Sequence, residues 1–163
     1  ATEGFAGVLA GIRRAYSRNM DKDPNFAHGQ DIRDRTFAFA CRIVTFCEQV
    51  YTTGGVARMM APQLLSCGTS VAAMLEEARA AESDRDFISK CSIGLKEARE
   101  AHVRLRLHEA CRIGPASEAA ALREEANALV SIIGTIVRNK RANVARKSIK
   151  RRQRAFVKVI TNS

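Results

Sequence analysis

Apolar residues recur at every third or fourth position along most of the chain, and this spacing predicts amphipathic helices. A first short set predicts a helix over residues 3–19, and residues 21–30, with Pro24 and Gly29, are interpreted as a linker. The main body begins near Asp31 with a helix of about 20 residues. The apolar positions of this helix are Phe39, Ile43, Phe46, Cys47, Val50 and Tyr51.

A second helix is predicted over about residues 56–80. It follows "TTGG" at 52–55, whose two glycines suit a tight connection between antiparallel helices. Pro62 is tolerated only in a first turn or at a kink, so an alternative start lies near Ala61. Gly68 and its two small neighbours in mid-helix predict a close approach of another helix.

Two further helices follow. "SDRD" at 83–86 predicts a capping box that opens the third helix, which ends near Arg112. "GPAS" at 114–117 stops that helix, and Ser117 is the expected N-cap of the fourth.

Four long helices with short links predict an all-α protein, with an up-down-up-down four-helix bundle over residues 31–137. Residues 1–30 add an N-terminal amphipathic helix and linker, and residues 138–163 add a basic C-terminal helical extension. The apolar faces are wide, which indicates either a monomer with a large core or a bundle that buries a second face against another subunit. We expect the oligomer.

The composition agrees with a helical protein. Apolar residues make up 46% of the chain, which has three prolines and no Trp. No apolar run approaches the ~20 residues of a membrane span, so we expect no membrane partner. The five cysteines form no CxxC and show no metal-ligand spacing, and we interpret them as buried thiols of a cytoplasmic protein.

The charge of the chain is concentrated at its end. The formal net charge is +10, from 27 Lys and Arg against 17 Asp and Glu. Residues 138–163 hold ten basic residues and no acidic residue, so residues 1–137 are neutral overall. A narrow apolar stripe at helical spacing runs through residues 140–159 of this tail, "KRANVARKSIKRRQRAFVKV". This pattern predicts a basic helix.

Phosphate is the natural partner of such a tail, because each contact releases condensed counterions. We therefore predict nucleic-acid binding through Arg138, Lys140, Arg141, Arg146, Lys147, Lys150, Arg151, Arg152, Arg154 and Lys158. Phe156 is the one aromatic residue of the tail, so few bases can stack there, and we expect recognition by charge and shape. The alternatives are a solvated extension of the last helix, an anionic membrane surface or an acidic protein partner.

Several motifs resemble a known family. They are Ser-x-Gly-Thr-Ser-Val at 66–71, Glu-Glu-Ala at 76–78, Ala-Glu-Ser-x-x-Asp-Phe-Ile at 81–88 and Leu-Lys-Glu-Ala-Arg-Glu at 95–100. Together with residues 31–44, they resemble the four-helix-bundle family of 23S rRNA intervening-sequence proteins, and the resemblance covers about residues 31–143. Met74 differs from the family pattern, because the family usually has Asn at this position. Any hydrogen bond that the Asn side chain would make is therefore absent in this chain.

The resemblance implies a left-handed bundle that assembles as a homopentameric ring and has no enzymatic activity. The chain is also similar to the accessory proteins of diversity-generating retroelements, most visibly at Gly54–Met60. That similarity implies a basic pentamer that binds nucleic acid and a reverse transcriptase. Five tails in one ring would turn the modest affinity of a single tail into strong avidity, and we expect RNA rather than DNA as the ligand.

No catalytic residue, metal site or cofactor is predicted. The chain has no GxxxxGK[ST], no GxGxxG and no Glu-x-x-His pair of the kind that di-iron bundles need. His102, His108 and Glu109 share the third helix, but adjacent residues on a helix point about 100° apart, so His108 and Glu109 do not face each other. We expect these side chains at a surface or an interface, and we expect a protein that is not an enzyme.

Charged residues on the second and third helices form the candidate oligomer interface. They are Glu76, Glu77, Glu97, Arg99 and Glu100. Glu100 and Arg104 have the i,i+4 spacing of an intrahelical ion pair. The group is interpreted either as solvated or inter-subunit salt bridges, or as a polar key that fixes the register between ring subunits.

Two functions from different classes follow from these patterns. The first is a non-enzymatic oligomeric bundle that binds nucleic acid through its tail, as an accessory to a reverse transcriptase or another RNA-handling enzyme. The second is a protein–protein assembly scaffold that binds no nucleic acid and docks a protein partner through its terminal helices.

Overall fold

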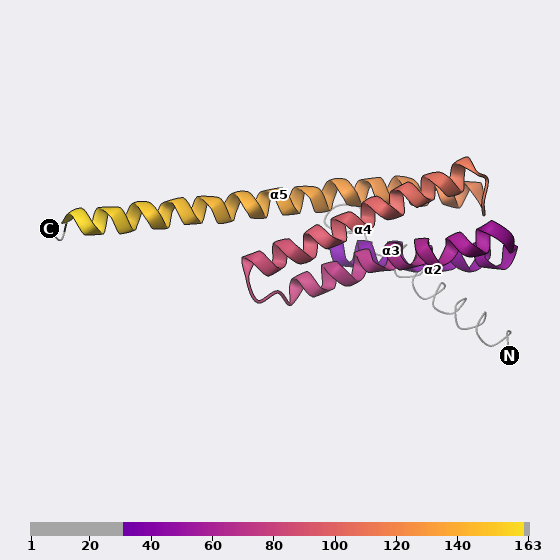
Figure 1. Cartoon of the computed structure of the whole chain (residues 1–163), viewed down its shortest axis with the longest axis horizontal. Coiled ribbons are helices and arrows are strands. Elements are labelled where there is room, and N and C mark those ends of the chain that lie inside the picture. Colours follow the sequence, from indigo (N-terminus) through magenta and orange to yellow (C-terminus); the bar gives the residue numbers. More distant parts are fainter. Residues whose placement is uncertain (1–30, 162–163) are drawn as a thin grey trace.

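The computed structural model describes residues 31–161, and the elements in this range are α2 (Ile32–Thr53), α3 (Gly55–Arg79), α4 (Asp84–Ala110) and α5 (Ala116–Thr161). Their connections lie at alternate ends, so consecutive helices run antiparallel (Figure 1). α2 packs on α3, α3 on α4 and α4 on α5, while α5 also contacts α2 and closes the bundle. The predicted all-α four-helix bundle is confirmed, and the helix predicted over residues 3–19 lies outside the described residues.

The core alternates large and small side chains. α2 and α5 contribute bulky residues such as Phe39, Phe46 and Leu129, each at most 1% exposed. α4 contributes mostly small ones, among them Ala98 and Ala101, which are fully buried. Small residues on α4 let its backbone approach its neighbours closely, where the bulky side chains of α2 and α5 fill the remaining space.

α3 approaches α2 closely at Gly68. A Cβ atom built on Gly68 would lie 2.7 Å from Cγ2 of Ile43, which is fully buried on α2. Real Cβ contacts essentially never reach this distance, so only glycine fits between α3 and α2 here. The close approach predicted from the small mid-helix residues is therefore confirmed.

Local signals in the sequence set most helix ends. Asp31 caps α2 by accepting a hydrogen bond from Arg33 N at 3.0 Å. Ser83 Oγ caps α4 by accepting from Asp86 N at 3.1 Å, as predicted from "SDRD". Gly54 and Gly55 have φ angles of 84° and 55°, so the turn between α2 and α3 uses the left-handed backbone that glycine adopts most readily.

The start of α3 agrees with the predicted range of about residues 56–80, whereas the predicted N-cap of α5 is wrong. α3 begins at Gly55 with Pro62 in its interior, so the alternative start near Ala61 is wrong. Ala57 is buried against the core, and this contact stabilises the helical conformation of the two turns that precede Pro62. α5 begins at Ala116, and Ser117 is not its N-cap, because the Pro115 carbonyl already accepts from Ala119 N at 3.0 Å. Proline has its φ fixed near −65°, which favours a helix start at this point.

His108 is buried, so its predicted place at a surface or interface is wrong. Its ring meets Phe46 edge-on, with centroids 5.3 Å apart. After α4, the chain turns back through Arg112 and Gly114, both with positive φ, and this turn brings the Ile113 carbonyl to 3.3 Å from His108 Nδ1. His108 Nε2 has no hydrogen-bond partner among the described residues.

The cysteines agree only in part with their interpretation as buried thiols. Cys47, Cys67 and Cys91 are buried, and burial raises the pKa of Cys47 to about 12 and that of Cys67 to about 11. These thiols therefore stay protonated and pack as small apolar groups. Cys41 is half-buried and Cys111 is exposed, because Cys111 is the C-cap residue of α4 rather than part of its packed face.

We expect the bundle to lose stability below about pH 6.5 because of His108. Burial lowers the pKa of this ring in the folded state, whereas it titrates normally in the unfolded chain. Below about pH 6.5 the unfolded state binds more protons than the folded state. The free energy of unfolding therefore decreases as the pH is lowered, by at most about 1.4 kcal/mol per pH unit for one such group. Urea unfolding at about pH 5, 6 and 7 measures this slope.

His108→Met removes the titrating ring, keeps an apolar side chain of similar size and should flatten the slope. His102→Gln is the matched control, because it removes the half-buried histidine of the same helix and leaves His108 in place. A slope in His108→Met equal to that of the unsubstituted protein would show that His108 is not its origin.

Candidate nucleic-acid interface

The first half of α5 packs in the bundle, and the second half projects from it. Its 46 residues span about 69 Å at ~1.5 Å per residue, and the helix runs well past the ends of α3 and α4 (Figure 1). Val137 is the last buried residue among its described side chains, which end at Gln153. The basic segment begins at Arg138, so the change in burial and the change in charge coincide.

The described cations of this segment face solvent. Lys140 is half-buried, and the exposed ones are Arg138, Arg141, Arg146, Lys147, Lys150, Arg151 and Arg152. Arg154 and Lys158 continue the same helix, but their side chains lie outside the described part. The structure thus places the predicted nucleic-acid-binding residues along one helical rod, where residues three, four and seven apart share a face.

The inner end of this rod touches the start of α4. Lys140 Nζ lies 2.7 Å from Asp84 Oδ1 and 5.0 Å from the centroid of the Phe87 ring. Lys147 Nζ lies 3.7 Å from Asp84 Oδ2. The hydrogen bond from Lys140 is the main cause that lowers the pKa of Asp84, so the carboxyl group is ionised.

A small cavity opens around this contact. Its volume is about 260 Å³, and it is lined by Asp84, Lys140, Asn143, Arg146, Lys147 and Lys150. We call it the basic notch. Its four cations are among the predicted nucleic-acid-binding residues, whereas Asp84 is not, because nothing in the capping motif at 83–86 indicates that this residue faces the tail.

The predicted oligomer-interface residues do not form one cluster. Glu77 pairs with Lys90 at 2.5 Å, near the end of α3. Glu100 pairs with Arg104 at 2.6 Å, as its spacing predicts, and Arg104 also donates to Gln63. Gln63 and Glu77 lie about 20 Å apart along α3 at ~1.5 Å per residue.

The other members of that group differ in their surroundings. Glu76 lies 3.9 Å from both Arg33 and Arg79. Glu97 is half-buried and Arg99 is exposed, both on α4. Each ion pair found here is within one chain, so the part of these residues in subunit contacts stays a prediction.

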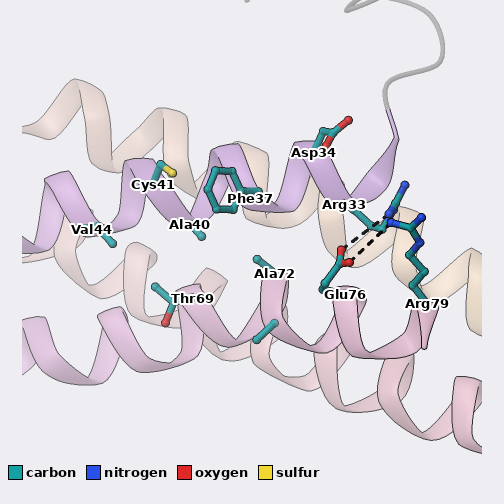
Figure 2. Close-up of a pocket in the computed structure, with 11 residues that line it drawn as sticks. Arg33, Asp34, Phe37, Ala40, Cys41, Val44, Thr69, Ala72, Glu76 and Arg79 are labelled. Atoms are coloured by element: carbon teal, nitrogen blue, oxygen red, sulfur yellow. Dashed lines mark ion pairs between the residues drawn. The ribbon is translucent and has the colours of Figure 1, made fainter. Parts of the chain in front are cut away.

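A second cavity lies between α2 and α3 and was not predicted. Figure 2 shows this apolar groove, with a volume of about 640 Å³. Its apolar lining comes from Phe37, Ala40 and Val44 of α2 and from Ala72 and Ala73 of α3. Sequence spacing cannot reveal such a groove, because its width depends on how the two helices are rotated against each other.

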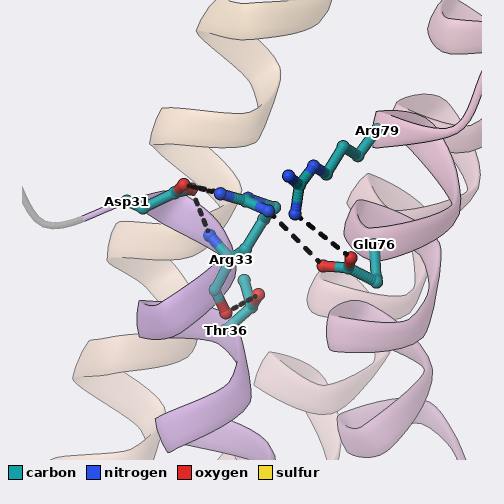
Figure 3. Close-up of polar contacts among 5 residues, drawn as sticks. All are labelled: Asp31, Arg33, Thr36, Glu76 and Arg79. Carbon is teal, nitrogen blue, oxygen red and sulfur yellow. Dashed lines mark hydrogen bonds and ion pairs between the residues drawn. The ribbon is translucent and has the colours of Figure 1, made fainter.

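Charged groups surround one end of the apolar groove. Arg33 of α2 donates a hydrogen bond to Asp31 and also forms an ion pair with Glu76 of α3 (Figure 3). Glu76 pairs in turn with Arg79, which lies on the same helix. Hydrogen bonds from Arg33 hold the pKa of Asp31 at about 2, so this carboxylate stays charged at any physiological pH. The network ties the first turn of α2 to the last turn of α3.

The described part of the chain shows neither the pattern of a membrane-spanning helix nor that of a metal site. None of its helices has an apolar stretch long enough to cross a bilayer. Within residues 31–161, no three His, Cys, Asp or Glu side chains gather where they could hold a metal ion.

Comparison with known proteins identifies the fold's relatives. The chain resembles a crystal structure of a protein with unknown function from the S23 ribosomal protein family of Bacteroides thetaiotaomicron, with a TM-score of 0.60 and 28% sequence identity. The similarity covers 66% of this chain and 98% of the other. No curated protein matches. The model of the 23S rRNA-intervening sequence protein family matches residues 29–135, which is more than half of the chain and stops just before the basic segment, so the protein belongs to that family.

Proposed function

We propose that this protein is a non-enzymatic, oligomeric bundle that binds nucleic acid, and RNA before DNA, through the basic half of α5. Support comes from the separation of charge. Residues 138–163 carry ten cations and no acidic residue, while the rest of the chain is neutral overall. The described buried residues of α5 end at Val137. The helix then runs past the start of α4, so the outer part of the basic segment projects from the bundle (Figure 1).

Most of these cations are available to a ligand. Among the described side chains of residues 138–153, only Lys140 and Lys147 contact a carboxylate, and in both cases it is Asp84. A phosphate backbone would neutralise the remaining charges and release its own counterions, which is the main source of non-specific affinity. The family name refers to 23S rRNA, and this reference supports RNA as the ligand.

In this role the protein acts by binding and assists an RNA-handling enzyme, such as a reverse transcriptase. The resemblance to retroelement accessory proteins supports this assignment. Assembly into a ring, pentameric by the same resemblance, would place several basic rods on one particle and strengthen binding through avidity.

The exposed apolar residues of α3 and α4 support an oligomer. Met59 and Val56 on α3 are 74% and 66% exposed, and Val103 and Leu107 on α4 are about half exposed. Apolar side chains this exposed on neighbouring helices are typical of surfaces that contact another protein. Together with the apolar groove, they also favour the second candidate function, a protein–protein assembly scaffold.

Binding of labelled RNA and duplex DNA across a salt series tests the proposed function. We expect the full chain to bind with a steep decrease of affinity as salt rises, because several phosphate contacts each release counterions. A chain that ends at Val137 keeps the last buried residue of α5 and should stay folded, with binding abolished. If the full chain forms an oligomer by light scattering but binds neither nucleic acid at the lowest salt, the scaffold function is favoured instead.

A further inference from the structure

Within the described part of the chain, one carboxylate contacts the basic half of α5, and it belongs to another helix. Asp84 is the first residue of α4, and its two oxygens contact Lys140 and Lys147, which are seven residues apart on α5. Spacing of seven places both lysines on the same face of the helix. Asp84 therefore lines the basic notch together with both lysines, and Arg146 and Lys150 line it too.

The contact is not needed to build the start of α4. Ser83 caps this helix, and its hydroxyl accepts the hydrogen bond from Asp86 N. α5 is fixed against the bundle by buried apolar residues such as Ile133 and Val137. Capping and packing therefore do not require the contact between Asp84 and the two lysines.

The pair is also easy to break. The side chains of Asp84 and Lys140 are 39% and 33% exposed, and that of Lys147 is 73% exposed. Ion pairs this accessible to water contribute little to stability, about 0–1 kcal/mol. A phosphate group could take over both lysines at small cost to the fold, whereas the nearby carboxylate would repel it.

We propose that the basic notch is a phosphodiester-binding site and that Asp84 is its intramolecular counter-ion, which competes with nucleic-acid phosphate for Lys140 and Lys147. The competition rests on the proposed function of α5. Asp84 lowers the affinity for any polyanion and sets the salt concentration at which binding begins. A chain that lacks this carboxylate holds the same lysines free for phosphate.

The test compares Asp84→Asn with Asp86→Asn in the full-length chain, with a labelled single-stranded RNA as the probe. Both variants lose one negative charge from the first turn of α4, but of these two carboxylates only that of Asp84 forms an ion pair with the described basic half of α5. We expect Asp84→Asn to bind about three- to tenfold more tightly at ~0.1 M salt, with a salt slope steeper by about one contact. Asp86→Asn should change affinity by less than about twofold.

A second comparison assigns the gain to the lysines. In a background of Lys140→Gln with Lys147→Gln, the substitution Asp84→Asn should no longer increase affinity, because the groups that it frees are gone. Equal affinities of Asp84→Asn and Asp86→Asn, or a gain that persists without the lysines, would overturn the counter-ion role. If the unsubstituted chain binds no RNA at all, the proposed function itself is wrong. This result differs from an unchanged affinity in Asp84→Asn, which would contradict the counter-ion role alone.

Discussion

Replacing Arg146, Lys150 and Arg151 by glutamine will weaken RNA binding about a hundredfold at ~0.1 M salt and will lower the salt slope by about two to three. All three side chains are exposed on the projecting half of α5. Each phosphate contact that is lost removes close to one released counterion, and the losses multiply because the contacts share one ligand. Fluorescence anisotropy across a salt series measures both quantities.

The matched control removes the same net charge from the bundle. Lys96→Gln, Arg106→Gln and Arg112→Gln change three exposed cations on α4 and on the turn after it. We expect this variant to bind RNA within about threefold of the unsubstituted protein, because the affected charges lie off the basic rod. Equal losses in the two triple variants would show that RNA responds to the net charge of the molecule, and the assignment of the site to α5 would be wrong.

Gly68→Ala will destabilise the bundle by about 1–3 kcal/mol, although alanine is the better helix former. The new Cβ would lie 2.7 Å and 2.9 Å from two side-chain carbons of Ile43. Ile43 is fully buried, so it has no free space to move into, and α2 and α3 must separate. Urea unfolding at neutral pH measures the loss.

Two other glycines in the same bundle calibrate this effect. A Cβ on Gly134 would meet its nearest neighbour at 3.7 Å, so Gly134→Ala should stabilise α5 by about 0.5–1 kcal/mol through helix propensity alone. A Cβ on Gly94 would lie 2.8 Å from Leu75 Cδ2, the end of a flexible side chain, so Gly94→Ala should fall between the two. A neutral or stabilising Gly68→Ala would contradict the close approach of α2 and α3.

The elements of the fold were predictable because their signals are local. Apolar spacing locates the four helices, and Ser83 and the "TTGG" turn act on backbone groups within three residues of themselves. The same locality explains the errors. The sequence predicts Ser117 as the N-cap of α5, but the helix begins earlier, because the carbonyl of Pro115 already accepts a helical hydrogen bond. At His108, the turn after α4 folds back over the ring and buries it.

The candidate site was only half predictable for the same reason. The cations of the tail are visible in the sequence as a run without acidic residues. Their counter-ion is not, because Asp84 lies more than fifty positions earlier and meets Lys140 only when α4 and α5 pack side by side. The apolar groove likewise depends on the pairing of α2 with α3.

The unbroken course of α5 has a consequence for how its basic half becomes ordered. A separate peptide of the same sequence would have to nucleate its own helix against mutual repulsion of its charges, which is unfavourable in water. Here the first turns are already formed against the core, so the basic half only has to propagate an existing helix. Repulsion along it weakens as salt rises or as a polyanion binds, and the reach of the rod from the bundle therefore follows the ionic surroundings of the protein.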